Sequence, residues 1–135
     1  MGALTRAAIL AAEDLRRERV DVPEWGGHVF VRTMTGTERD AFEGGIVQRR
    51  NGSGGSPERT LDNYRARLLT YVVVDEVGAP IFAREDDAKA LGEKSIAALE
   101  RLFNVATRLN AITEQDVQAL TENLAPGRSG SSTSG

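Results

Sequence analysis

The sequence predicts a mainly α (α+β) fold: a small helical domain of about five helices with one N-terminal two-stranded β-hairpin and a disordered C-terminal tail. Three observations lead to this expectation. Apolar residues recur at three- and four-residue spacing in several segments that begin with capping residues. Two β-branched and aromatic runs near the N-terminus flank a Gly-Gly pair, which suits a tight hairpin turn. A Ser/Gly-rich stretch with nothing to bury ends the sequence.

Length and composition limit the possibilities further. We expect a single helical domain over residues 1–125 and a disordered Gly/Ser tail over residues 126–135, because 135 residues support one core. Cysteine is absent, which excludes disulfides and thiolate chemistry. The net charge of −3 lacks the positive field that nucleic-acid binding depends on. No apolar run reaches the roughly 20 residues of a membrane span, and no secretion signal is recognisable. We therefore expect a soluble cytoplasmic protein with neither nucleic acid nor a membrane as partner.

The strongest helical pattern lies between Ser95 and Asn110. Its apolar residues fall on one helical face, so that face is expected to be buried. Ser95 can cap the first turn, and Gly92 can close the preceding helix in a left-handed conformation. The predicted buried stripe contains Ile96, Leu99, Leu102, Phe103, Ala106 and Leu109.

The N-terminal segments are read as a short helix and a hairpin. Residues 5–15 are alanine-rich and predict a weakly anchored helix, in which Ile9 and Leu10 could form a docking edge. The hairpin is predicted at residues 20–34, with strands over residues 20–25 and 28–34. Its first strand should be an edge strand, because Pro23 cannot donate a ladder hydrogen bond. His28, without a second histidine or any cysteine to share a metal, is read as an ordinary strand residue.

The middle of the chain predicts two longer helices separated by a flexible loop at 51–56. Thr35 and Glu38 form a capping box that starts a helix to about Arg50, weakened by two consecutive glycines. Ser56 and Pro57 open the next helix. Residues 70–74 either continue that helix or form a strand, and the continuous apolar stripe favours helix to about Val74.

The C-terminal half is expected to be helical apart from one turn. Residues 75–80 predict the turn, and residues 84–91 a short helix that Gly92 ends. A last helix is expected to begin at Thr113, with Val117, Leu120 and Leu124 facing inward.

No catalytic, metal or cofactor site is expected, because no base, nucleophile or metal-ligand cluster assembles in this sequence. A non-enzyme that binds proteins through an apolar groove or an open strand edge fits better. Trp25 is either a core anchor or a partner contact, and the scarcity of large side chains favours the core. The candidate partner-binding residues are Ile9, Leu10, Trp25, Phe30, Phe42, Tyr71 and Phe82.

Five segments together resemble the tail assembly chaperones of long-tailed, siphovirus-type bacteriophages. The resemblance covers roughly residues 9–124 and departs at the glycine-rich insert 51–56, whose length is expected to vary. The five segments are residues 9–15 (ILAAEDL), 22–26 (VPEWG), 32–42 (RTMTGTERDAF), 74–82 (VDEVGAPIF) and 91–95 (LGEKS).

The resemblance implies a non-virion protein that acts in the host bacterial cytoplasm. It would bind the tape measure protein, a long and largely helical chain that tends to aggregate, and keep it soluble during virion morphogenesis. It would also help to recruit tail tube protein subunits, while self-association is left open. A second, longer form made by ribosomal frameshifting is implied as well, with Gly127–Arg128 as the candidate slip site.

Two other functions are weighed against the chaperone. A small helical nucleic-acid-binding regulator would use Arg59, Arg65 and Arg67, with Arg49–Arg50 nearby. The acidic balance and the acids between these arginines argue against it. The second alternative is a structural tail or head-completion subunit that stays in the particle.

Overall fold

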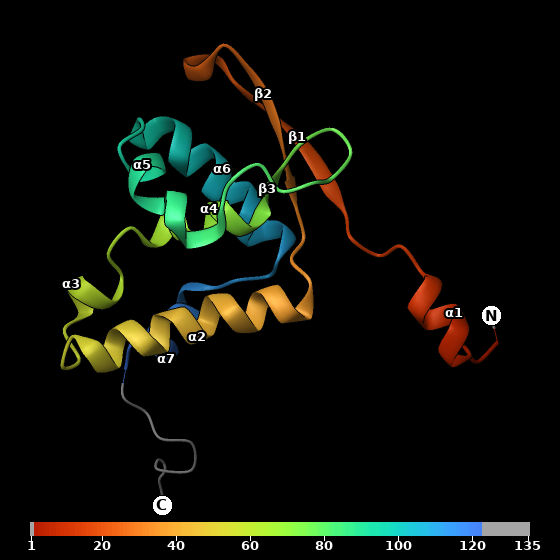
Figure 1. Cartoon of the computed structure of the whole chain (residues 1–135), viewed down its shortest axis with the longest axis horizontal. Helices are drawn as coiled ribbons and strands as arrows, with labels where there is room; N and C mark the ends of the chain where they lie inside the picture. The colour runs from red at the N-terminus through yellow and green to blue at the C-terminus, as the bar shows by residue number, and fades with distance from the viewer. Residues whose placement is uncertain (1, 123–135) are drawn as a thin grey trace, which may run out of the picture.

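The computed structural model describes residues 2–122. Most of the helices lie on one side of a small antiparallel sheet (Figure 1). The predicted mainly helical class is confirmed. The predicted inward Leu124, the tail and the Gly127–Arg128 slip site lie outside the described residues. The helices are α1 (Arg6–Ala11), α2 (Gly36–Gly52), α3 (Pro57–Thr60), α4 (Tyr64–Val72), α5 (Ala88–Gly92), α6 (Ile96–Leu109) and α7 (Glu114–Thr121), with 3-10 turns η1 (Pro23–Trp25) and η2 (Arg84–Asp87). The strands are β1 (Arg17–Val22), β2 (Gly27–Arg32) and β3 (Val73–Val74), in the order β1-β2-β3.

The hairpin forms as predicted, but its strands are shifted toward the N-terminus. β1 starts at Arg17 and stops at Val22, because Pro23 opens the 3-10 turn η1 instead of extending the strand. Gly26 closes that turn with a left-handed φ of 77°, a conformation that favours glycine. β1 is an edge strand of the sheet, as expected, and it turns Val20 and Val22 toward the core.

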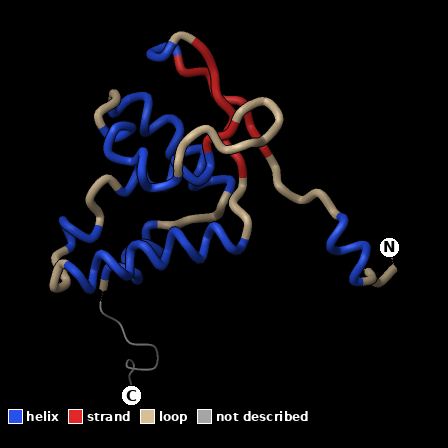
Figure 2. Tube along the Cα trace, viewed as in Figure 1, coloured by secondary structure: helices blue, strands red, loops and turns tan. Residues whose placement is uncertain are grey.

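The third strand corrects the prediction of helix to Val74. α4 ends at Val72, and the next two residues pair with β2 in the register Val31↔Val73 and Phe30↔Val74 (Figure 2). Both valines of β3 are buried. The β-branched run adopts its strand preference here because β2 offers it an unpaired edge. The far side of β3 is covered by a bridge from Val74 to Pro80.

The helix predicted from Pro57 onward is interrupted, which is a second correction. α3 has only four residues, and Asn63 takes a left-handed φ of 54° before α4 begins. Gly92 does not adopt the left-handed conformation predicted for it. It instead lies close to another side chain, because a Cβ at Gly92 would be 2.5 Å from Asn63 Oδ1.

The predicted helix starts are confirmed. Thr35 and Glu38 form the reciprocal capping box of α2, Ser56 caps α3, Ser95 caps α6 and Thr113 caps α7. α2 runs past Arg50 to Gly52, so it includes the first two residues of the expected loop.

The core lies between the sheet and helices α2, α4, α5 and α6. Most of the predicted α6 stripe is buried or half-buried in it, and Leu102 is fully buried. Ile96 is the exception: 58% of its surface is exposed, so its assignment to the core was wrong. The largest fully buried side chains are Phe42, Ile46, Leu68, Leu69 and Leu102.

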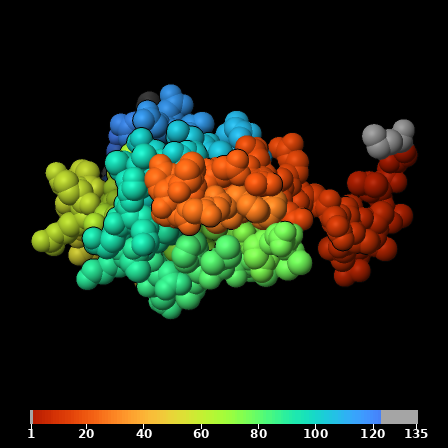
Figure 3. Space-filling view, turned by 90° about the horizontal axis from the view of Figure 1, so that it is seen from above, coloured from red at the N-terminus to blue at the C-terminus, as the bar shows by residue number. Residues whose placement is uncertain are grey.

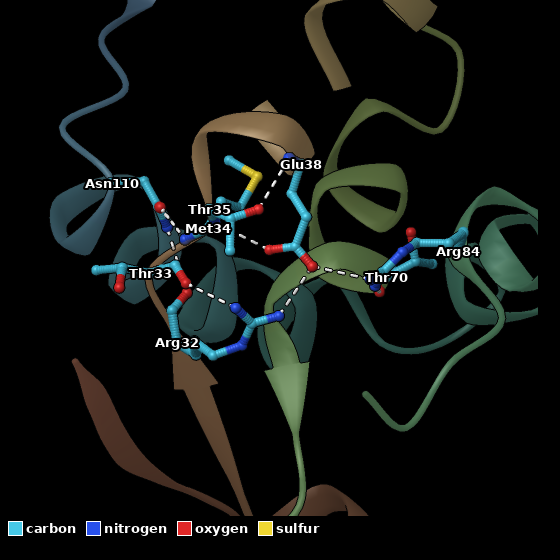
Figure 4. Close-up of polar contacts among 8 residues, drawn as sticks. All are labelled: Arg32, Thr33, Met34, Thr35, Glu38, Thr70, Arg84 and Asn110. Atoms are coloured by element: carbon cyan, nitrogen blue, oxygen red, sulfur yellow. Dashed lines mark hydrogen bonds and ion pairs between the residues drawn. The ribbon is translucent and has the colours of Figure 1, made fainter. Parts of the chain in front are cut away.

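A polar cluster centred on Glu38 joins β2, α2, α4 and η2 (Figure 4). Glu38 Oε2 accepts hydrogen bonds from Arg32 at 3.0 Å and from Arg84 at 2.8 Å. Arg84 also reaches the carbonyl of Thr70 at 3.4 Å. Burial alone would raise the pKa of Glu38, but the hydrogen bonds from Arg32 and Thr35 and the two guanidinium charges lower it below its ordinary value of 4.5.

Candidate protein-binding surfaces

An open groove of about 790 Å³ lies between α4, α6 and α7. We call it the α4–α6–α7 groove. Tyr64 and Phe103 meet edge-to-face in its wall, with ring centroids 5.4 Å apart. Burial raises the pKa of Tyr64 to about 12, so its hydroxyl stays uncharged at neutral pH. The apolar lining residues are Leu61, Tyr64, Ala66, Ile96, Leu99, Phe103, Ile112 and Val117. The charged residues Arg65 and Glu114 and the polar residues Asn63, Asn104, Thr107, Thr113, Gln118 and Thr121 also line it.

The groove exists because α7 packs on α2 rather than closing over α6. Ala111, with a left-handed φ of 52°, turns the chain away from the end of α6. Arg39 then donates to the Asn110 carbonyl at 3.0 Å and lies 3.9 Å from Asp116. Arg50 donates to the Leu120 carbonyl at 3.2 Å. These contacts hold α7 on α2 and leave apolar surface of α4 and α6 uncovered.

A second, smaller pocket of about 300 Å³ lies at the tip of the hairpin. We call it the hairpin-tip pocket. Arg101 forms two hydrogen bonds with Glu24, at 2.7 and 2.9 Å, and so fixes the η1 turn against α6. The hydrogen bond from Arg101 lowers the pKa of Glu24 to about 2. The lining residues are Trp25, Phe82, Ala90 and Leu91, with the charged residues Asp87 and Lys94.

The N-terminal arm, which we define as residues 4–16, stands away from the rest of the molecule (Figures 1 and 3). No residue of α1 is buried, and Ile9 and Leu10 are 55% and 66% exposed. Thr5 caps the helix by accepting a hydrogen bond from Ala8 at 3.1 Å. The arm is anchored where Arg16 and Thr33 exchange hydrogen bonds of 2.9 and 3.0 Å, at the start of β1.

The structure distributes the seven candidate residues over four environments. Ile9 and Leu10 lie on the arm, and Trp25 and Phe82 meet in the hairpin-tip pocket. Phe42 and Tyr71 pack together in the core with ring centroids 6.0 Å apart, so they support the fold rather than face a partner in this conformation. Phe30 is half-buried on the sheet, beside His28 and under the Arg17 guanidinium.

Sequence reasoning missed the α4–α6–α7 groove. Ile96 falls at the same helical spacing as the buried residues of α6, so no local pattern separates it from the core. Tyr64 likewise has the helical spacing of the buried Leu68 and Tyr71. Only the placement of α7 on α2, a contact between distant segments, shows which residues remain uncovered.

Four of the five arginines considered for nucleic-acid binding make contacts within the molecule. Arg49 pairs with Glu85 at 2.9 Å, and Arg67 lies 3.6 Å from the same carboxylate. Arg65 lies 3.5 Å from Glu100. Cations engaged in this way are poorly placed to neutralise phosphates, which argues against the regulator.

Residues 2–122 hold no group of three histidine or acidic side chains arranged to bind a metal ion. Over the same residues, no helix combines the length and the apolar character that crossing a bilayer requires.

Comparison with known proteins places this arrangement in a family. Among solved structures, the chain is similar to the tail assembly chaperone of bacteriophage HK97, with a TM-score of 0.52 and 21% sequence identity over 70% of this chain and 85% of that one. At this identity the likeness concerns the fold. No curated protein matches significantly. The family model described as phage tail assembly chaperone, a chaperone rather than an enzyme family, matches residues 3–123. The chain therefore belongs to the phage tail assembly chaperone family.

Proposed function

We propose that this chaperone binds the tape measure protein of its phage, keeps it soluble and helps to recruit tail tube subunits. It acts in the host bacterial cytoplasm and does not stay in the virion. Family membership supports the general role. The observation that carries the specific role is the α4–α6–α7 groove, a surface of mixed apolar and polar residues that the described fold leaves open.

The groove suits an amphipathic helix. Its apolar floor can receive a helical stripe of side chains at three- and four-residue spacing, as in other helix-in-groove complexes. Arg65 and Glu114 supply both signs of charge beside it, so no strong field selects one particular sequence. A largely helical tape measure protein offers many such stripes. Weak binding at many of them would cover its apolar surface along its length.

The test is co-expression of the chaperone with the tape measure protein of the same phage. We expect a larger soluble yield of the tape measure protein and its co-purification with the chaperone. Ile96→Glu should lower the binding affinity by more than about tenfold, because it would place a carboxylate beside the apolar lining residues. The fold should tolerate this change, since Ile96 is 58% exposed.

Val77→Glu is the matched control, because Val77 is 84% exposed and does not line the groove. Unchanged solubility together with no co-purification would contradict the proposed partner. Equal binding by the Ile96→Glu and Val77→Glu variants would contradict the groove as the binding site, while leaving the partner in place.

We also propose that a longer form arises by ribosomal frameshifting near Gly127–Arg128. The last described helix ends at Thr121, so a fusion at that point would leave the described fold intact. The Ser/Gly-rich composition beyond it suits a tether. Mass spectrometry of infected cells should find a longer product that shares peptides up to about Leu124. If the gene has neither a slippery codon run nor an overlapping reading frame, the two-form proposal is wrong.

A further inference from the structure

We propose that the N-terminal arm of one copy of this chain docks into the hairpin-tip pocket of a second copy. The contact uses neither the α4–α6–α7 groove nor the tape measure protein, so it goes beyond the function proposed above.

The arm has an apolar face that nothing in its own chain covers. α1 spans six residues and has no buried side chain, whereas isolated helices of this length are marginal in water. Arg6, Ile9 and Leu10 lie at positions i, i+3 and i+4, on one side of the helix. Glu13, at i+7, follows two residues after the helix ends. The arm therefore presents two exposed aliphatic side chains between a cation and an anion.

The hairpin-tip pocket carries the complementary features. Its apolar walls, formed mainly by Trp25, Phe82 and Leu91, enclose about 300 Å³, which suits the insertion of Ile9 and Leu10. Asp87 and Lys94 supply opposite charges at the same pocket. In the docked arm, Arg6 faces Asp87 and Glu13 faces Lys94. The apolar insertion supplies the affinity, and the charge pairs set the direction of the arm.

The position of the anchor favours a second copy over the same chain. Arg16 is hydrogen-bonded to Thr33 at the open end of the hairpin, whereas the pocket lies beyond its closed end. The six residues of β1 separate these ends by about 17–20 Å at roughly 3.3 Å per residue. Residues 12–15 span at most about 14 Å when fully extended. To reach its own pocket, the arm would have to reverse at Arg16 and lie almost fully extended.

The contact joins two different surfaces, so each copy can both give an arm and accept one. Two copies that exchange arms reciprocally close as a two-fold dimer. Otherwise a row of copies keeps a free arm at one end and a free pocket at the other. Such head-to-tail contacts extend into open assemblies unless their rotation closes a ring.

Analytical ultracentrifugation over a range of concentrations tests the proposal on the full chain. The wild type should associate as its concentration rises. Ile9→Asp/Leu10→Asp should be monomeric yet keep its unfolding midpoint, because neither side chain is buried. Ala90→Trp, which fills the pocket from an exposed position, should also be monomeric alone. Mixed in equal amounts, these two variants should form heterodimers and nothing larger, since they retain one intact arm and one intact pocket.

Charge reversal gives an independent readout. Lys94→Glu should weaken association several-fold, and adding Glu13→Lys should restore it. Lys89→Glu is the control, because Lys89 is exposed on the same short helix but does not line the pocket. A wild type that stays monomeric at every concentration would overturn the proposal. Association that persists in the Ile9→Asp/Leu10→Asp variant or in the Ala90→Trp variant would overturn it too. So would a mixture of the two variants that forms no heterodimers. The assay contains no tape measure protein, so its failure is separate from failure of the proposed function.

Discussion

Glu38 combines a local and a long-range role. Its Oε1 accepts the backbone N–H of Thr35 at 3.0 Å, which completes the capping box of α2. Its Oε2 accepts hydrogen bonds from Arg32 and Arg84, which come from β2 and η2. The capping role is readable from the spacing of Thr35 and Glu38, whereas the pairing with Arg84 becomes visible only once the chain is folded.

Loss of the Glu38 charge should be strongly destabilising. Arg32 is only 7% exposed, so Glu38→Gln would leave a buried guanidinium without its anion. We expect the free energy of unfolding to fall by about 3 kcal/mol, the lower end of the range for broken buried pairs, because this pair is not wholly buried. Glu43→Gln is the control. It breaks a pair with Arg39 near the surface and should cost less than about 1 kcal/mol in urea unfolding.

The same substitution should change the response to acid. The folded-state pKa of Glu38 lies below its ordinary value of 4.5, so its ionised form stabilises the fold above that pH. This contribution is lost as the pH falls through 4.5 toward the folded-state pKa. The stability gap between the wild type and Glu38→Gln should therefore narrow below about pH 4.5. A gap that stays constant to about pH 3 would show that ionisation of Glu38 does not stabilise the fold.

At the scale of elements, α2 shows how two adjacent glycines differ. The helix is continuous through Gly44 and Gly45, although both lower its intrinsic stability. A Cβ at Gly44 would meet nothing within 4 Å. A Cβ at Gly45 would lie 2.8 Å from Glu85 Oε2, a carboxylate held by Arg49 and by the Tyr71 hydroxyl. Gly45 thus makes room for a contact between α2 and η2.

The two alanine substitutions should consequently have different effects. Gly44→Ala should raise the free energy of unfolding by about 1 kcal/mol, the difference in helix propensity. Gly45→Ala has the same propensity gain but must displace Glu85, so it should be less stable than Gly44→Ala by at least about 1 kcal/mol. Urea unfolding of both variants measures the difference. Equal stabilisation by the two changes would show that the Glu85 carboxylate moves without cost.

The elements also show which parts of the fold can be predicted from sequence. Helix starts were predictable because capping is a local contact, as at Thr35 and Ser95. The end of α4 was not, because Val73 becomes a strand residue only through its pairing with Val31 of β2. The break at Asn63 likewise accompanies the close approach of Gly92 from a distant segment. The groove depends on similar long-range placement, whereas the exposed Ile9 and Leu10 of the arm were identified from sequence as a candidate docking edge.

At the scale of the whole molecule, the apolar surfaces are separate from one another. The α4–α6–α7 groove and the hairpin-tip pocket share no lining residue, and the arm lies apart from both (Figure 1). A chaperone built in this way can hold a client helix at one surface while another surface contacts a neighbouring copy. The proposals for the two surfaces can therefore be tested, and can fail, independently.

The two-residue strand β3 has a consequence for the order of folding. It pairs with residues of β2 roughly 40 positions earlier, and closing a loop of that length costs roughly 3 kcal/mol of chain entropy. So short a ladder does not offset that cost, whereas the β1–β2 hairpin needs only the η1 turn. We expect the hairpin to form early in synthesis and β3 to join after α2 and α4 have packed, an order that pulse-labelled hydrogen exchange can follow. α6 packs on β1 and β2. The inner face of the hairpin therefore stays exposed to water until α6 has left the ribosome.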